Sequence, residues 1–444
     1  MSLNSATAPS HTLPALSEVR WLRFATFSTF YIAQGFPIGL FSLAMPAWLL
    51  ERGMSTTQVA GFTFISSLPW TFKLVAAPLM DRYSFLPMGR RRPWILAAQI
   101  GVTVSSAMLL TVVEPISQLT LLTAIAFAIN AFSASQDVAV DGMAIDILPA
   151  QEQGRANSFM MGGQVLGYSL SGALSATLLA QGGVPLAGAA LVSMVVLVTV
   201  VSLLFRERRG ERLLPWTAGV STLRSDLPPA PAWHIIVGNL LRVTLVPMSL
   251  LLVLVEFLYR SSAGVGLVLY PNVGVQMLGY PAEQFSWFLS ASSANAAVLG
   301  LVIGLLIDRA GAVRMLKITL LLSAGLHFAI GTLHAYWTVP GFAPACMLML
   351  DLVGQSVMVS IIALFMSVCH PAVAATQFAV YMAIANLGRS SGAAAFPLLD
   401  KFLEAHQMFY AMSAAVLIAA ALMTRFDRHR MVRSVASPTQ PELS

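Results

Sequence analysis

Apolar runs of about twenty residues recur along this chain from one end to the other. An α-helix of that length crosses the roughly 30 Å hydrocarbon core of a bilayer. Hydrophobic residues make up 57% of the 444 positions and charged residues only 10%, whereas soluble domains carry about 25% charged residues. The sequence therefore predicts an all-α membrane protein. We expect twelve transmembrane helices at 24–50, 57–80, 93–113, 119–145, 157–180, 184–205, 244–277, 285–307, 315–335, 340–369, 375–398 and 406–424.

A weak internal repeat divides these helices into two pseudo-symmetric bundles of six. The loop after the second helix contains Asp81-Arg82, and the loop after the eighth contains Asp308-Arg309, about half the chain later. Duplication of a six-helix unit places the same motif at two positions about half the chain apart. We expect a cytoplasmic tail at 1–20, an N-terminal bundle at 21–205, a charged and Pro-rich cytoplasmic linker at 206–243, a C-terminal bundle at 244–424 and a cytoplasmic tail at 425–444.

The positions of the cationic residues predict which side each loop faces. If the N-terminus is cytoplasmic, only Arg52 and Lys401 lie outside, while Lys73, Arg260 and Arg389 fall within helices. The other twenty of the 25 Lys and Arg residues then face the cytoplasm, as the positive-inside rule requires. The net charge of +6 is thus a sign of topology and does not indicate nucleic-acid binding.

Acidic residues within the predicted helices are the most informative side chains, because the bilayer penalises charge. Asp137 lies roughly 13 Å from the cytoplasmic end of its helix, and Asp141 follows one turn later on the same face. Two carboxylates so close in a low dielectric cannot both ionise at low cost. We interpret the pair as a proton-coupling site; the alternative is that one acid only pairs with Lys73 or bonds to a neighbouring helix.

Further ionisable residues at mid-depth are candidate substrate contacts. Glu256 and Asp351 lie about as deep as Asp137. Arg260 follows Glu256 by four residues, so the two can neutralise each other, or Arg260 can bind a substrate carboxylate or phosphate. Arg389 has the same two interpretations. The candidate substrate-binding residues are Gln34, Lys73, Gln136, Glu256, Arg260, Asp351, Gln355 and Arg389.

The segment 244–277 is too long for one straight crossing. Gly264, Gly266 and Pro271 lie in its outer part, so we expect a bent or broken helix whose outer segment gates a cavity. Pro37 and Pro46 in the first helix are consistent with a matching flexible helix.

Several short motifs resemble those of the major facilitator superfamily, and in particular its AmpG-type muropeptide permease branch. The branch also includes acetyl-CoA and siderophore transporters, to which the stretch from Gln136 to Gly142 is similar. The matching motifs are Gly35-Phe36-Pro37, Ala47-Trp48, Phe72-Lys73, Asp81-Arg82-Tyr83, Gly89-Arg90-Arg91-Arg92, Ser135-Gln136-Asp137, Asp146-Ile147-Leu148-Pro149, Leu258-Tyr259-Arg260, Ala375-Thr376-Gln377-Phe378-Ala379 and Gly388-Arg389.

The superfamily resemblance implies a conformational latch at the cytoplasmic loops. In it, Asp81 would meet the positive end of a neighbouring helix, and Arg82 or Arg90 would pair with Asp146. Asp308 and Arg309 are the counterparts in the second half. Alternatively, the basic run from Arg90 to Arg92 only contacts anionic lipid.

The resemblance also implies the function. We expect a proton-coupled secondary transporter of the bacterial inner membrane that imports a muropeptide by alternating access for cell-wall recycling. A siderophore or an acyl-CoA-type anion is the alternative substrate, and a membrane sensor without transport activity is the alternative class. The sequence has no P-loop, G-x-S-x-G or H-E-x-x-H motif, so we expect no enzyme activity, cofactor or metal. The expected partners are the substrate, protons and membrane lipid, with the protein acting as a monomer.

Overall fold

Nearly every residue described in the structure is helical. In this computed structural model the described residues are 14–83, 85–219, 238, 245–368 and 374–427. Within them the only β-type contact is an isolated bridge between Ala15 and Arg206. Among these residues, eight helical spans are long and apolar enough to cross a membrane. The predicted all-α membrane fold is confirmed.

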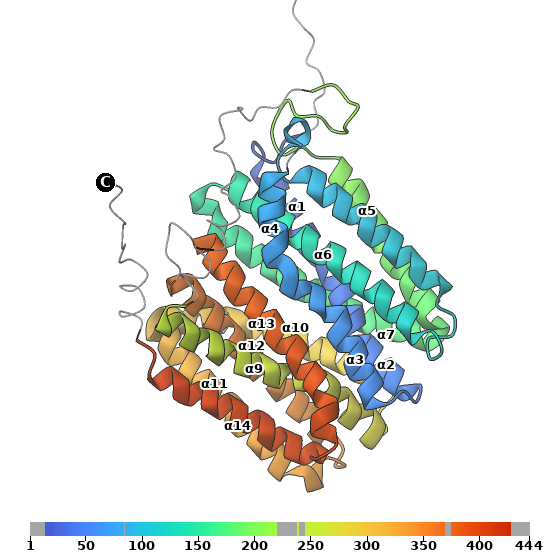
Figure 1. The fold of residues 1–444 in the computed structure, drawn as a ribbon, viewed down its shortest axis with the longest axis vertical. Helices are drawn as coiled ribbons and strands as arrows, with labels where there is room; N and C mark the ends of the chain where they lie inside the picture. Colours follow the sequence, from blue (N-terminus) through green and yellow to red (C-terminus); the bar gives the residue numbers. More distant parts are fainter. Residues whose placement is uncertain (1–13, 84, 220–237, 239–244, 369–373, 428–444) are drawn as a thin grey trace, which may run out of the picture.

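The first half of the chain forms one bundle, drawn in blue to green in Figure 1. Its elements are α1 (Arg20–Gly39) continued by η1 (Leu40–Ala44) and α2 (Met45–Glu51), α3 (Thr56–Ser67) continued by η2 (Leu68–Phe72) and α4 (Lys73–Arg82), the short η3 (Leu86–Met88), α5 (Arg92–Met108) continued by η4 (Leu109–Thr111), α6 (Leu119–Ile147) and α7 (Ala150–Leu203).

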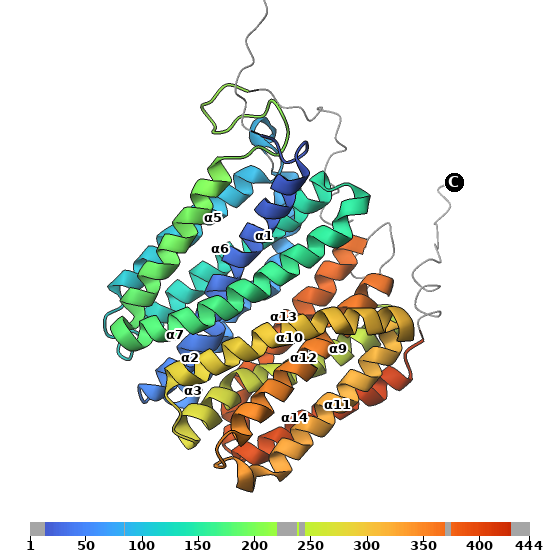
Figure 2. The same cartoon turned by 180° about the vertical axis from the view of Figure 1, so that it is seen from behind.

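The second half forms a second bundle beside the first, drawn in yellow to red (Figures 1 and 2). Its elements are α9 (Pro247–Pro271) continued by η5 (Asn272–Met277), α10 (Ala282–Ala310), α11 (Ala312–Thr332), the short η6 (His334–Tyr336), α12 (Phe342–Val368), α13 (Ala374–Asp400) and α14 (Ala405–Thr424). These elements correspond to all twelve predicted helices, with ends that differ by several residues in places.

α7 contains two of the predicted crossings, joined by a tight reversal. Gly182 and Gly183 have non-helical backbone angles, and Pro185 follows two residues later. Gly183 has a φ of 64°, a conformation that glycine adopts at little steric cost. The sequence predicted this break between 180 and 184.

The two long helices predicted to bend contain π-helical segments and are otherwise continuous. η5 follows Pro271 at the end of α9, and η1 follows Pro37 near the end of α1. Proline has no N–H to donate to the preceding turn, and π-helical turns accommodate such an interruption. The predicted distortion thus occurs at equivalent places in the two halves. Thr244, the first residue of the predicted seventh helix, lies outside the described residues.

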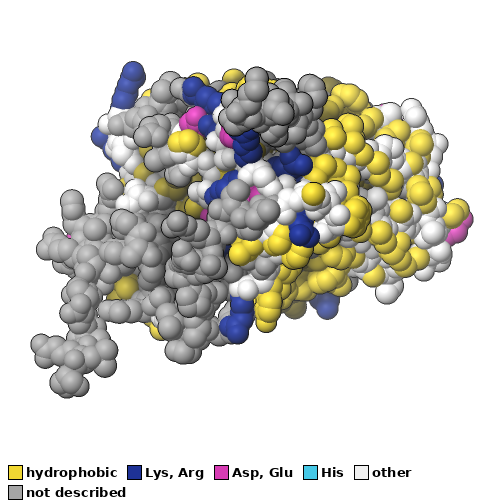
Figure 3. Space-filling view, turned by 90° about the horizontal axis from the view of Figure 1, so that it is seen from above, with side chains coloured by type: hydrophobic (Ala, Val, Ile, Leu, Met, Phe, Trp, Pro, Cys, Tyr) yellow, Lys and Arg dark blue, Asp and Glu magenta, His cyan; other side chains and the backbone are white. Residues whose placement is uncertain are grey.

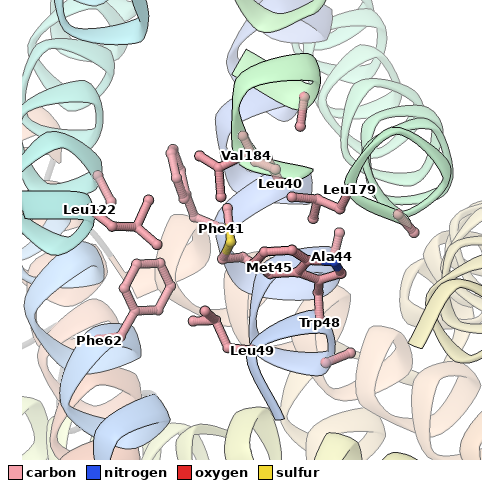
Figure 4. Close-up of a cluster of buried hydrophobic side chains, with 14 of the residues drawn as sticks. Leu40, Phe41, Ala44, Met45, Trp48, Leu49, Phe62, Leu122, Leu179 and Val184 are labelled. Atoms are coloured by element: carbon pink, nitrogen blue, oxygen red, sulfur yellow. The ribbon is translucent and has the colours of Figure 1, made fainter. Parts of the chain in front are cut away.

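Glycines let one pair of helices approach closely in each bundle. A Cβ atom at Gly167 of α7 would lie 2.0 Å from the Ile32 carbonyl oxygen of α1, and one at Gly392 of α13 would lie 2.0 Å from that of Ser261 in α9. The same packing device therefore recurs in both halves. Beyond the α1–α7 contact, buried apolar residues fill the interior of the first bundle. Among them, Phe41 and Met45 face Phe62 (Figure 4).

The loops lie at two ends of the molecule because the helices alternate in direction. We call the end that contains residues 14–19, 83–91 and 206–219 the linker end, and the other the opposite end. The first part of the predicted linker is packed tightly, because Glu207 and Glu211 are buried; its residues 220–237 and 239–243 lie outside the described part. In the view of Figure 3, Lys and Arg side chains gather in one region, and hydrophobic side chains cover another.

Candidate functional site

Asp137 lies at the centre of a buried polar cluster in the first bundle. It belongs to α6 and is 4% exposed. The Lys73 ammonium of α4 forms an ion pair with one carboxylate oxygen, and the Gln34 amide of α1 donates a hydrogen bond to the other. Gln164 of α7 donates in turn to Gln34 Oε1 at 2.6 Å. The Lys73 Nζ atom lies 4.5 Å from the ring centroid of Trp70.

Asp141 extends this cluster by one helical turn. Its carboxylate accepts a hydrogen bond from the Tyr31 hydroxyl of α1. Since α1 supplies both Gln34 and Tyr31, the two carboxylates of α6 face the same neighbouring helix. The structure thus brings together Asp137, Asp141, Lys73 and Gln34. The Lys73–Asp137 pair is the contact that the sequence left open as the alternative interpretation, whereas Gln34 was predicted only as a substrate contact.

A second polar cluster occupies the other bundle. Arg260 Nε donates to Glu256 Oε1 at 2.9 Å within α9, so the structure shows the pairing that the i, i+4 spacing allowed. The other carboxylate oxygen of Glu256 is buried without a hydrogen-bond partner. The Arg260 guanidinium also contacts the Met358 sulfur of α12. The same helix, α12, carries Asp351.

Asp351 and Arg389 border the same region. Asp351 Oδ2 of α12 accepts a hydrogen bond from Ser293 of α10 at 3.1 Å, and Gln355 follows one turn later, half-buried. Arg389 of α13 has a buried Nε with no hydrogen-bond partner. Tyr168 of α7 lies close enough to Asp351 and Arg389 to interact with both side chains electrostatically. The two bundles therefore both contribute polar groups here.

One predicted contact lies elsewhere. Gln136 Oε1 accepts a hydrogen bond from Gln99 Nε2 at 3.1 Å, and Gln99 Oε1 accepts one from the Thr199 hydroxyl at 3.1 Å. These residues belong to α6, α5 and α7 of one bundle. Gln136, which was predicted to contact substrate, here bonds to Gln99 and not to the Asp137 cluster, because adjacent residues of a helix point about 100° apart.

Sequence reasoning missed Tyr31, Gln164 and Tyr168. Tyr31 lies three residues before Gln34, and Gln164 lies four before Tyr168, spacings that place polar groups on one helical face. That spacing was the available signal. Uncharged polar residues are common in membrane helices, however, and only the packing of α1 against α7 shows that these ones meet the acids.

Hydrogen bonds between the two bundles lie at mid-depth or at the opposite end. Ala282 N donates to Glu51 at 2.9 Å, and Thr56 donates to Asp400 at 2.9 Å. Nearer the middle, Ser67 and Ser390 are hydrogen-bonded at 2.9 Å. Further contacts of this kind are Gln276 with the Leu50 carbonyl, Thr177 with Glu283, Trp287 with Thr177 and Asn386 with the Trp70 carbonyl.

The ion pairs recorded at the linker end stay within the first bundle. Asp146 lies 3.2 Å from Arg91 Nε and 3.7 Å from Arg90 Nη1, and Glu152 lies 2.7 Å from Arg23. Among the described residues, the hydrogen bonds that join the bundles lie from mid-depth to the opposite end, and no ion pair joins the bundles at the linker end.

The predicted latch residues are only partly brought together. Arg90 reaches Asp146, but Arg82 does not: its side chain is exposed and lies 6.0 Å from the Tyr83 ring centroid. Arg309 is also exposed. The side chains of Asp81 and Asp308 lie outside the described set. Of the two arginines predicted as alternative partners of Asp146, Arg90 is the one that meets it, because the chain turns after α4 and brings Arg90 and Arg91 to that acid.

Glu207 is a structural residue of this end that the sequence did not reveal. Its carboxylate accepts hydrogen bonds from the backbone N–H groups of Arg90 at 3.0 Å, of Arg91 at 2.8 Å and of Arg92. Burial raises the pKa of Glu207 above its ordinary value, and these three donors oppose the shift. Glu207 therefore fixes the loop that carries the two arginines which meet Asp146.

No group of three His, Cys, Asp or Glu side chains suited to a metal ion occurs among the residues that the structure describes. Each of the two polar clusters pairs a carboxylate with a cationic side chain. The cluster of the second bundle also contains buried polar atoms without a hydrogen-bond partner, in Glu256 and Arg389.

Comparison with known proteins places the chain in a family. The anhydromuropeptide permease of Escherichia coli strain K12 is 28% identical over 407 residues, which are 88% of this chain and 77% of that protein. A protein named putative transporter AmpG 1 of Rickettsia prowazekii is 27% identical over 143 residues, 31% of each chain.

Solved structures of low sequence identity share the fold. A D-xylose-proton symporter has a TM-score of 0.68 at 13% identity, with 91% of this chain and 97% of that one covered. A POT family transporter in complex with a thioalcohol conjugated peptide has a TM-score of 0.71 at 11% identity, covering 96% and 99%. The family model described as Major Facilitator Superfamily matches residues 27–393. The chain therefore belongs to the Major Facilitator Superfamily and is a multi-pass membrane transporter, not an enzyme.

Proposed function

We propose that this transporter imports a muropeptide across the bacterial inner membrane, driven by the proton gradient. The relationship to the Escherichia coli permease, which extends over 88% of the chain, supports the substrate class. The observation that carries the mechanism is the arrangement of Asp137 and Asp141 against Lys73, Gln34 and Tyr31.

The cluster of the first bundle is suited to hold and release a proton. Asp137 and Asp141 lie one turn apart in α6 and share the neighbouring helix α1. Charge repulsion in a low dielectric favours a state in which one proton remains on the pair. Lys73 stabilises the ionised form of Asp137, so the Lys73–Asp137 contact is expected to break when Asp137 is protonated. That change would alter how α4 and α1 pack against α6.

The cluster of the second bundle is suited to an anionic group of the substrate. Arg389 Nε is buried and has no hydrogen-bond partner, and a guanidinium binds carboxylates in a bidentate geometry. Asp351 and Gln355 lie on a neighbouring helix face and can bond to the hydroxyl and amide groups of a sugar-peptide. We therefore assign the muropeptide carboxylate to Arg389 and Arg260.

The contacts between the bundles fit one state of an alternating-access cycle. The hydrogen bonds that join Glu51 to Ala282 and Thr56 to Asp400 would close the opposite end, while the linker end holds ion pairs within one bundle. The bias of Lys and Arg toward the linker end makes that end cytoplasmic. The described conformation then corresponds to a carrier closed toward the outside.

Uptake into proteoliposomes tests the proposal. Labelled anhydro-muramyl disaccharide-peptide should accumulate when an inward proton gradient is imposed, and accumulation should collapse with a protonophore. In parallel, expression in a bacterial strain that lacks its muropeptide permease should restore recycling-dependent β-lactam response. Accumulation of a siderophore or an acyl-CoA, without muropeptide uptake, would establish the alternative substrate. The absence of any substrate uptake would contradict the proposal.

A further inference from the structure

A groove of the second bundle lies apart from both polar clusters. It is a cavity of about 620 Å³ at the linker end, formed where α10 ends, α11 begins and α12 ends. α10 and α11 both pack extensively on α12 but touch each other little. The cavity is therefore a crevice between α10 and α11, with Ala363 and Leu364 of α12 among its lining residues.

Two cationic side chains line this crevice. Arg314 and Lys317 lie in the first two turns of α11. Neither has an ion pair with any residue that the structure describes, and Arg314 is exposed. Arg314 and Lys317, three residues apart on one helical face and without an ion-pair partner in the described part of the chain, form a local positive charge that a phosphate group can neutralise.

The crevice continues into the apolar side wall of the bundle. Ile318 of α11 follows Arg314 by one turn and is 42% exposed, and Leu321 follows Lys317 by one turn and is 54% exposed. On the facing helix α10, Leu306 is 40% exposed. In a membrane-spanning chain, this wall faces the acyl chains. The part of the crevice that carries Arg314 and Lys317 therefore lies where the apolar wall meets the polar headgroup region of the bilayer.

We propose that this crevice binds an anionic phospholipid. Arg314 and Lys317 contact the phosphate of the headgroup, the cavity holds the glycerol region, and an acyl chain lies along Leu306, Ile318 and Leu321. The two-part character of the surface favours a lipid over a soluble anion, because a free phosphate would use the cations but leave the apolar wall without a role. This lipid site is independent of which substrate the transporter carries.

Native mass spectrometry of the full-length protein in detergent tests the site. Phosphatidylglycerol is titrated in, with phosphatidylcholine as the neutral lipid, and the affinity of the first bound lipid is measured. An Arg or Lys near a membrane surface contributes about 1 kcal/mol toward anionic lipid, so the double variant Arg314→Gln/Lys317→Gln should bind phosphatidylglycerol about thirty-fold more weakly. Binding of phosphatidylcholine should be unchanged.

Two further variants separate the groove from general charge. Arg309→Gln removes one exposed cation from the last turn of α10 without altering the cavity lining, and should leave phosphatidylglycerol affinity unchanged. Ala363→Phe keeps both cations but fills the cavity, and should weaken binding about as much as the double variant. A soluble headgroup analogue, glycerol 3-phosphate, should compete poorly.

Three outcomes would overturn the proposal. The first is equal phosphatidylglycerol affinity in wild type and the double variant. The second is an equal loss in Arg309→Gln, which would indicate non-specific charge attraction. The third is full competition by inorganic phosphate, which would identify a soluble-anion site. Circular dichroism and a thermal melt of each variant show whether it is folded, so that a lost lipid is attributed to the crevice.

Discussion

The ammonium group of Lys73 in α4 forms an ion pair with the Asp137 carboxylate in α6, deep in the first bundle. A lysine and an aspartate 64 positions apart thus meet at a place where an unpaired charge is costly. The Gln34 amide bonds to the same carboxylate, so three elements of the bundle converge on one titratable group.

The first prediction concerns Asp137. Asp137→Asn should abolish uptake driven by a proton gradient, because the amide cannot take up and release the coupled proton, while exchange of preloaded substrate continues. Driven and exchange fluxes are compared in the same proteoliposomes. Glu114→Gln removes an exposed carboxylate from a loop at the opposite end and should retain both fluxes. Driven uptake by the Asn variant at the wild-type rate would exclude Asp137 as the coupling group.

The second prediction concerns Arg260. Arg260→Ala should weaken binding of an anionic substrate by about 1.5–3 kcal/mol if the guanidinium makes a charged hydrogen bond to it. Affinity is measured by isothermal titration calorimetry of the purified protein. The double variant Arg260→Ala/Glu256→Gln removes the carboxylate that Arg260 neutralises and serves as the control. If the double variant regains wild-type affinity, Arg260 acts only as the partner of Glu256.

The third prediction concerns the contact between α1 and α7. Gly167→Ala should destabilise the protein by about 1–3 kcal/mol, because the added Cβ would lie 2.0 Å from the Ile32 carbonyl oxygen. Gly162→Ala, in the same helix, meets nothing within 4 Å and should be neutral or slightly stabilising. A thermal melt in detergent compares the two variants. Equal melting temperatures would show that the helices separate without cost.

The fourth prediction concerns pH and the linker end. Burial raises the pKa of Glu211 from 4.5 to about 7. Between these pH values the folded protein binds more protons than the unfolded chain, so the contribution of Glu211 to stability falls as the pH rises from 4.5 to about 7 and stays low above that. Glu211 Oε1 is also buried without a hydrogen-bond partner, which adds to the cost of ionisation.

Glu211→Gln should therefore stabilise the protein at pH 8 by about 1–2 kcal/mol and have little effect at pH 5. Melting temperatures at the two pH values provide the measurement. Glu18→Gln, which alters an exposed carboxylate nearby, should show no such difference. A stabilisation of Glu211→Gln that is equal at both pH values would show that ionisation of Glu211 is not the cause.

Individual residues show how far local pattern predicts position. Asp137 and Asp141 were recognisable because charge is rare in apolar helices, and their spacing of one turn is a local property. The reversal at Gly182 and Gly183 was also recognisable, because the apolar run there is too long for a single crossing. Gln136, next to Asp137 in sequence, bonds to Gln99 in a different part of the bundle, and no local pattern indicates that difference.

The sequence by itself determined the helices, their approximate ends and the division into two halves. The length of each apolar run and the positions of Pro, Gly and charged residues are properties of short stretches of sequence, so they can be recognised without the fold. Only the tertiary structure decided which polar side chains meet. Tyr31 reaches Asp141, and Glu207 holds the loop of Arg90, through contacts between segments 110 and 117 residues apart. Such contacts depend on how helices pack and rotate against one another, and one sequence does not specify that rotation through its periodicity alone.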